Sequence, residues 1–145
     1  MSYTNMTQAG KDLVKDADTS TQRSTLGIST GTHTTNWSGI WATSQSGNLS
    51  WQKVINEVSL FLPAVIATAT IGSFISIDTL LPASLWPTTE ERDEIIIQNA
   101  GYKSGGEVVI SSTGSVKIYA YIEEGNFSGS GSAGFPKMTV RYNLS

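Results

Sequence analysis

The stretch LSWQKVINEVSLFL at residues 49–62 is the clearest indicator of how this chain folds. It contains two strand-like runs, residues 49–54 and 57–62, on either side of a short break at Ile55 and Asn56. In the second run, apolar residues recur at every other position: Val58, Leu60 and Leu62. A period of two is typical of a strand with one face toward a core, so the stretch predicts an antiparallel hairpin.

Further strand signals lie on both sides of this hairpin, at the spacing typical of a β-sandwich. We expect strands over residues 36–42, 66–77 with a break at 71–73, 94–98, 107–111, 116–122 and 137–144. Three consecutive isoleucines at 95–97 indicate a strand that is buried on both faces. Residues 45–48 are expected to form a turn and residues 126–134 a flexible glycine-serine loop. Eight or nine short strands without a convincing helix among them predict an all-β, antiparallel β-sandwich of jelly-roll type.

The composition limits the classes of partner. With a net charge of −3 and a pI near 5.0, the chain has no basic stripe for a nucleic acid. Its longest apolar run, residues 60–69, is too short to cross a bilayer, so we expect no membrane insertion. Cysteine is absent, which fits a protein made in the cytoplasm and used outside the cell. The N-terminus lacks the basic-then-apolar pattern of a signal peptide.

A second informative tract, ADTSTQRSTLGI, occupies residues 17–28. Thr19 and Gln22 fit a capping box at the start of a helix, and Gly27 after Leu26 fits its left-handed end. A helix of under two turns is marginal alone, so we expect it to dock on something. We interpret residues 1–32 as a leader with a short helix and a linker over residues 27–32, and residues 33–145 as the β-sandwich head.

The same tract resembles the A-D-x-x-x-Q-R-x-x-L-G-(L/I) linker of bacteriophage tail fibres. The later motifs LLPASLWP, GEVVI and GSVKIY, at residues 80–87, 106–110 and 114–119, resemble the head domains that end viral and phage fibres. The hairpin of residues 49–60 is also similar to a segment of these heads, although Ile55 and Glu57 flank Asn56 where the family often has glycine. The chain is therefore identified by resemblance as the C-terminal, receptor-binding head of a phage tail fibre or another viral fibre.

This resemblance implies a homotrimer at the tip of a tail or capsid fibre of a virion, beside other fibre or baseplate proteins. It also implies attachment to a host-cell surface receptor, with a polysaccharide as the favoured ligand, and it requires no cofactor. Two alternatives stay open. The chain could be a structural trimerisation or decoration module without a ligand, or a polysaccharide depolymerase, for which it is short.

Ligand-binding residues are expected in loops at the end of the head that is remote from the leader. The residues we select combine exposed polar groups with aromatic rings, a pairing suited to glycans: Tyr102, Lys103, Asn126, Ser128, Ser130 and Trp86. The first five lie beside or within glycine-rich segments. Trp86, between Leu85 and Pro87, could instead be a core residue.

Subunit contacts are expected near the leader and on one sheet face. The residues we select are Leu26, Trp37, Trp41, Tyr119 and Tyr121. Alternation over residues 116–122 places the two tyrosines opposite an aliphatic core face, where they could serve a subunit interface or sugar stacking; we favour the interface.

The chain offers no convincing catalytic residue and no convincing metal ligands. His33, the one histidine, has no orienting acid in sequence; three copies around a trimer axis are the only route to a metal site. Acidic residues cluster once, at Glu90, Glu91, Asp93 and Glu94. We interpret this cluster as a solvated rim that discourages edge-to-edge strand pairing, rather than as the paired acids of a glycosidase or a cation site.

Overall fold

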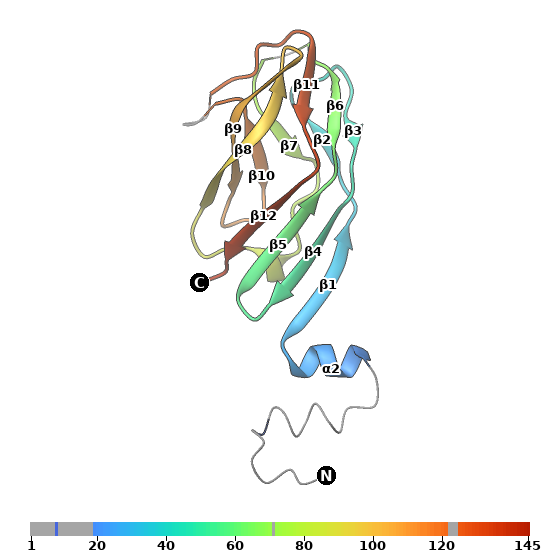
Figure 1. Ribbon diagram of the computed structural model, residues 1–145, viewed down its shortest axis with the longest axis vertical. Helices are drawn as coiled ribbons and strands as arrows, with labels where there is room; N and C mark the ends of the chain where they lie inside the picture. Colours follow the sequence, from blue (N-terminus) through green and yellow to red (C-terminus); the bar gives the residue numbers. More distant parts are fainter. Residues whose placement is uncertain (1–7, 9–18, 71, 122–124) are drawn as a thin grey trace.

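A computed structural model of the chain describes residues 8, 19–70, 72–121 and 125–145. These residues form two antiparallel sheets packed as a nearly closed sandwich (Figure 1). The four-stranded sheet has the order β1 (Ile28–His33), β4 (Leu49–Val54), β5 (Glu57–Leu62) and β12 (Met138–Asn143). The eight-stranded sheet has the order β3 (Gln45–Ser46), β2 (Asn36–Ser38), β7 (Ile75–Ile77), β10 (Val116–Tyr119), β9 (Tyr102–Ile110), β8 (Glu91–Asn99), β11 (Ser132–Phe135) and β6 (Val65–Thr68). The predicted all-β antiparallel sandwich is confirmed.

The hairpin predicted from residues 49–62 forms with the expected bounds. Strands β4 and β5 pair from Val54 opposite Glu57 to Ser50 opposite Phe61. The alternating residues Val58, Leu60 and Leu62 are at most 1% exposed, because they face the eight-stranded sheet. Alternation over β12 is confirmed in the same way, with Val140 and Tyr142 buried.

Trp37 and Trp41 belong to the core of one chain, so the prediction that they form a subunit interface is wrong. Trp37 is fully buried and its ring meets the edge of Phe135 at 4.7 Å between centroids. The Trp41 Nε1 atom donates to the carbonyl oxygens of Ala67 and Ala133 at 3.2 and 3.1 Å. Both indoles lie in short strand β2 or just beyond it, where the two sheets meet, and neither has surface left for a second subunit.

Strand β2 is also shorter than the run predicted over residues 36–42. It stops at Ser38 because Gly39 has φ +123, a conformation open to glycine, and because a Cβ at Gly39 would overlap the carbonyl oxygen of Phe74. The chain then bends and carries Ile40 and Trp41 into the core.

Three further expectations need correction. The isoleucine run is not buried on both faces: Ile97 is 1% exposed, but Ile96 on the opposite face is 61% exposed. The turn predicted at residues 45–48 contains the short strand β3, and the loop predicted at 126–134 contains most of β11. In each case pairing with a distant strand, which local composition does not encode, decides the structure.

The leader enters the head through helix α2 (Thr19–Thr25), which is under two turns long as predicted. Its end at Gly27, with φ +72, is the predicted left-handed position. The helix begins at Thr19 itself, so the residue that would cap it, Asp18, lies outside the described residues, as does the rest of the tract at 16–18. The predicted linker at residues 27–32 is wrong, because Ile28–His33 forms β1 on the edge of the four-stranded sheet. The division into leader and head stays a prediction.

A buried tyrosine ties the last strand to the loop before β8. The Tyr142 hydroxyl donates to the carbonyl oxygen of Leu85, at the end of the 3-10 helix η1 (Ala83–Leu85), at 2.7 Å. Burial raises the pKa of the Tyr142 hydroxyl well above its ordinary value. The neutral hydroxyl is therefore the form that the folded chain selects.

Replacing Tyr142 by phenylalanine should lower the free energy of unfolding by about 1–2 kcal/mol near pH 7, because the buried Leu85 carbonyl loses its donor. The raised pKa gives this difference a pH dependence. The unfolded tyrosine ionises above about pH 10, whereas the folded one stays protonated, so the wild type loses stability there and Tyr142→Phe lacks this loss. Urea unfolding at about pH 7 and about pH 10.5 measures both effects. A gap between the two proteins that widens at the higher pH would contradict the expectation.

Candidate functional site

The end of the sandwich remote from α2 carries two adjoining loops. Figure 1 shows the turn between β8 and β9 and the segment leading into β11 together at the top of the molecule, with α2 and the N-terminus at the bottom. The turn is Ala100–Gly101, and both residues have positive φ, +51 and +85. This is the pattern of a two-residue turn whose twist matches antiparallel strands.

The second loop is fastened to this turn by backbone and amide contacts. The Ser128 amide donates to Asn99 Oδ1 at 3.0 Å, and the Gly101 amide donates to the Ser132 carbonyl at 2.7 Å. Phe127 is 3% exposed and anchors the loop in the core. Asn99, which the sequence analysis did not select, is thus the residue that joins the two loops. The signal that could have revealed it is its place directly before Ala100–Gly101, since asparagine is common beside such turns.

Five of the six predicted ligand-binding residues gather at this end. Tyr102 is 77% exposed, the largest exposed fraction among the exposed large hydrophobic side chains. The others also reach the surface: Lys103, Asn126, Ser128 and Ser130. We call these five residues the distal cluster. Their side chains supply one aromatic face, one cation, two hydroxyls and an amide on a shallow surface, which can stack on a sugar ring and exchange hydrogen bonds with its hydroxyls.

Trp86, the sixth predicted residue, does not belong to this end. It is only partly exposed, packs against the core, and its Nε1 atom donates to the Leu81 carbonyl at 2.7 Å. A Cβ at Gly114 would overlap this nitrogen, so the ring is enclosed within the chain. Its loop lies at the opposite end, where Thr88 N bonds the Leu144 carbonyl and Leu144 N bonds that of Asn56. The interpretation of Trp86 as a core residue is the one that the structure supports.

The remaining predicted interface residues differ in exposure. Leu26 is 47% exposed beside α2, and Tyr121 is 54% exposed. Tyr119 is 6% exposed because Phe74 covers it within the same chain, with 5.5 Å between ring centroids, and Lys117 Nζ lies 4.6 Å from the Phe74 ring. The prediction that Tyr119 reaches a second subunit is therefore wrong, while Leu26 and Tyr121 are accessible.

His33 lies in strand β1 rather than in a linker, and it is 8% exposed. Its Nε2 atom donates to the Thr79 carbonyl at 2.8 Å, which requires the tautomer with the proton on Nε2. This bond ties β1 to the segment after β7. A buried imidazole with this structural contact is poorly placed to bind an ion on a symmetry axis.

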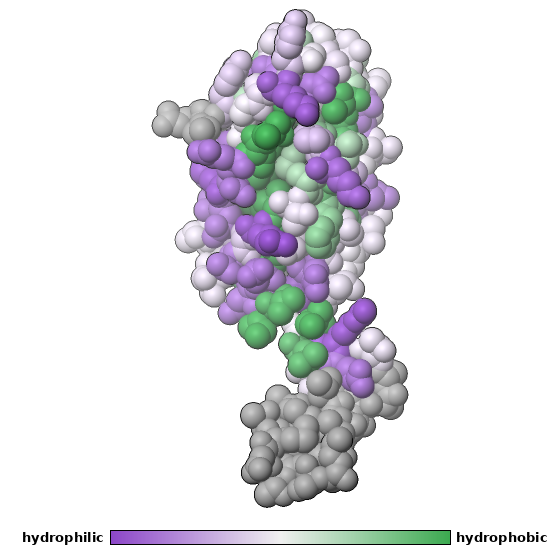
Figure 2. All heavy atoms as spheres, viewed as in Figure 1, coloured by the Kyte–Doolittle hydropathy of each residue, from purple (hydrophilic) through white to green (hydrophobic). Residues whose placement is uncertain are grey.

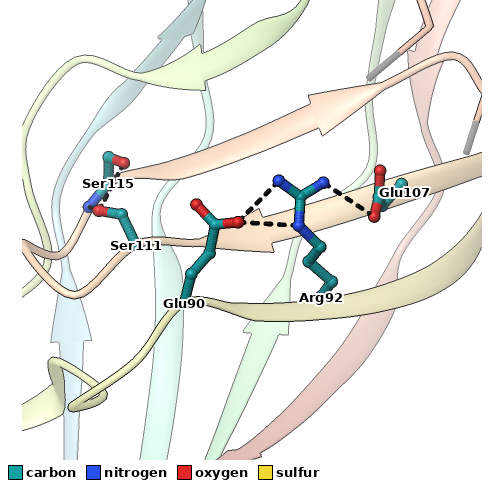
Figure 3. A network of polar contacts seen from close by, with 5 residues as sticks. All are labelled: Glu90, Arg92, Glu107, Ser111 and Ser115. Carbon is teal, nitrogen blue, oxygen red and sulfur yellow. Dashed lines mark hydrogen bonds and ion pairs between the residues drawn. The ribbon is translucent and has the colours of Figure 1, made fainter. Parts of the chain in front are cut away.

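The acidic cluster lies around the start of β8, and one arginine joins two carboxylates there (Figure 3). Arg92 contacts Glu90 Oε1 at 2.7 Å and the buried Glu107, on β9, at 3.2 Å. This part of β8 pairs with β9 on one side only, because β11 reaches it at Gln98 alone. Charged side chains along an unpaired edge fit the interpretation that they discourage strand pairing.

A groove beside this edge tests the glycosidase alternative. Glu91 and Asp93 line a cavity of about 180 Å³ between β8 and β12, with Val108, Ile110 and Val140 on its apolar wall. Both carboxylates come from the same strand, and β12 contributes Arg141. A glycosidase needs acids on both sides of the scissile bond, so this arrangement does not provide one.

Among residues 8, 19–70, 72–121 and 125–145 there is no group of three His, Cys, Asp or Glu side chains that could hold a metal ion. In the same part of the chain, no helix has the length and apolar character needed to cross a membrane. The expectation that the protein needs no metal or cofactor stays a prediction.

Fold and surface together describe an all-β module that presents loops at one end and a helical leader at the other. No family model matches the chain. It is 34% identical over 125 residues to the structural protein V8 of the Sputnik virophage, covering 82% of this chain and 68% of V8. The chain therefore belongs to the family of this viral structural protein. Among solved structures, it is similar to the reovirus attachment protein sigma1, described in complex with α-2,3-sialyllactose, with a TM-score of 0.44 and 12% identity over 82% of this chain and 67% of sigma1.

The family relation confirms the viral part of the sequence-based resemblance, at the level of a viral structural protein. A tail-fibre or fibre-head identity is a finer assignment than this relation carries. It also agrees with the expectation of a non-enzymatic role, since the relative is named for its place in the virus and not for a reaction.

Proposed function

We propose that this protein is a component of the virus particle that attaches to a host-cell surface through the distal cluster, with a glycan as ligand. The observation that carries the proposal is the gathering of Tyr102, Lys103 and the serine-rich loop at the end remote from the leader. The leader would join the rest of the particle, and the opposite end would be the first part to reach a surface.

The physical character of the distal cluster favours a weak, shallow site. Tyr102 offers an exposed ring, and the hydroxyls of Ser128 and Ser130 lie 3.5 Å apart in one loop. The hydrogen bonds through Asn99 and Gly101 hold the two loops in one arrangement, so little ordering is needed on binding. If several copies stand together on the particle, as the fibre resemblance implies, each weak site raises the effective concentration of the others.

Tyr102→Ala should remove most of the binding of the purified full chain to host cells, with a loss of about tenfold or more in apparent affinity. The reason is that stacking on one exposed ring supplies a large share of the energy of a shallow site. Flow cytometry with labelled protein, followed by a glycan array, measures the effect. Because Tyr102 begins β9 and is 77% exposed, thermal unfolding should be nearly unchanged.

Phe61→Ala is the matched control, since Phe61 is an aromatic residue 37% exposed on the four-stranded sheet, away from the distal cluster. It should bind host cells like the wild type. Equal binding by wild type and Tyr102→Ala would refute a role for the distal cluster, and equal loss in both variants would indicate a surface that is not local to it.

The name of the V8 relative favours a second candidate, a structural module of the particle without a ligand. In that case the wild-type chain binds neither cells nor any glycan on the array, and particles that lack it still adsorb to host cells. Adsorption that falls when the chain is removed, together with binding by the isolated chain, would exclude this second candidate.

A further inference from the structure

Ile55 combines two features that are each unfavourable in an isolated chain. It occupies the turn between β4 and β5 with φ +58, a region that β-branched residues rarely adopt. It is also 67% exposed, although it is one of the largest apolar side chains. Glycine or asparagine would serve the same turn without strain and without exposing apolar surface. Strained residues of this kind are concentrated where a function requires them.

Ile55 is not alone on this surface. Val54 is 40% exposed and Leu26, at the end of α2, is 47% exposed. The Ile55 amide donates to the Gly27 carbonyl at 2.9 Å, and Ile28 lies opposite Val54 in the β1–β4 ladder, so the turn and the helix end are joined. We call Leu26, Val54 and Ile55 the basal patch. Figure 2 shows hydrophobic surface gathered where the head meets α2.

The helix beside the basal patch is itself open to solvent within the part of the chain that the structure describes. None of its seven residues is buried. A helix of this length gains too little from its own hydrogen bonds to be stable in water, so its stability must come from packing. One covering surface would explain both the exposed helix and the exposed basal patch.

We propose that the basal patch is a contact between copies of this chain, and that Ile55 is kept in its strained turn for this contact. A second copy is the occupant that fits best, because an uncharged apolar patch is complementary to itself around a symmetry axis. In addition, the 18 residues that precede α2 enter the molecule at this end, so copies joined through their leaders bring their basal patches together. This inference does not depend on what the distal cluster binds.

Ile55→Gly separates a contact role from a purely local one. Glycine relieves the strained backbone, so the thermal midpoint of the full chain should hold or rise at concentrations where it is monomeric. Self-association should weaken by about tenfold or more, as measured by sedimentation over a range of concentrations. Ala100→Gly is the matched control, because Ala100 is the other described non-glycine residue with positive φ and lies at the distal end. It should share the relief of strain and keep wild-type association.

The absence of cysteine from the chain permits a second, independent readout. Ile55→Cys should form a disulfide-linked pair of chains under mild oxidation, at a protein concentration where Ala100→Cys remains unlinked. A wild type that stays monomeric at every concentration overturns the proposal. So does Ile55→Gly that associates as tightly as the wild type, or cross-linking that is equal at positions 55 and 100.

Discussion

Trp37→Ala is expected to lower the free energy of unfolding by about 3–5 kcal/mol, a large part of the total stability of a domain of this size. The indole is fully buried, packs edge-on against Phe135, and donates to the Gly47 carbonyl at 2.7 Å. The substitution therefore opens a large cavity and leaves a carbonyl without its donor. Urea unfolding at one fixed protein concentration measures the change.

The same variant tests where the subunit contacts lie. If Trp37 belongs to the core of one chain, the loss of stability appears in the monomer and does not depend on protein concentration. If it belonged to an interface, Trp37→Ala would lower the mass in solution while the monomer kept its stability. Phe61→Ala, at a partly exposed position, serves as the control and should cost less than about 1 kcal/mol.

Gly134→Ala is expected to destabilise the fold by about 3 kcal/mol or more, since strain and steric overlap act together. Gly134 has φ +150, and a Cβ there would overlap the carbonyl oxygen of Val65. It sits in β11 between Ile66 of β6 and Gln98 of β8, so any relief must move a paired strand. The expected result is a much lower thermal midpoint, or a chain that fails to fold when expressed.

Gly105→Ala is the control for this prediction. Gly105 lies in β9 with an ordinary φ, and a Cβ there would meet no atom within 4 Å. Its replacement by alanine should be neutral or slightly stabilising, because the unfolded chain loses freedom. Equal effects at positions 105 and 134 would show that the close approach of β6 to β11 is not a constraint on the fold.

These two predictions concern the rigidity on which the proposed function depends. Gly134 and Trp37 lie in the part of the sandwich that supports the distal cluster: β11 contacts both β6 and β8, and the turn at Ala100–Gly101 continues from β8. A variant that loosens this support should weaken attachment even though it touches no ligand. Tyr102→Ala, by contrast, should weaken attachment without a change in stability, and comparing the two separates support from contact.

Local patterns were sufficient to predict much of the fold. The hairpin of residues 49–62 and the final strand were readable because alternation in one segment reports directly on which face is buried. The left-handed end of α2 at Gly27 was readable for the same kind of reason, since it depends on the conformational freedom of one residue. Five residues of the distal cluster were also selected from composition, although their position at one end was not known.

Long-range contacts decided the rest. An exposed Ile96 beside a buried Ile97 depends on which face of β8 meets the other sheet, and the burial of Trp37, Trp41 and Tyr119 depends on strands and loops that are distant in sequence. The linker at 27–32 became β1 because β4 offered a free edge to pair with. A sequence lists which side chains are apolar, but whether water or another segment covers each one is a property of the folded chain. For that reason the basal patch, with its strained Ile55, became visible only in three dimensions.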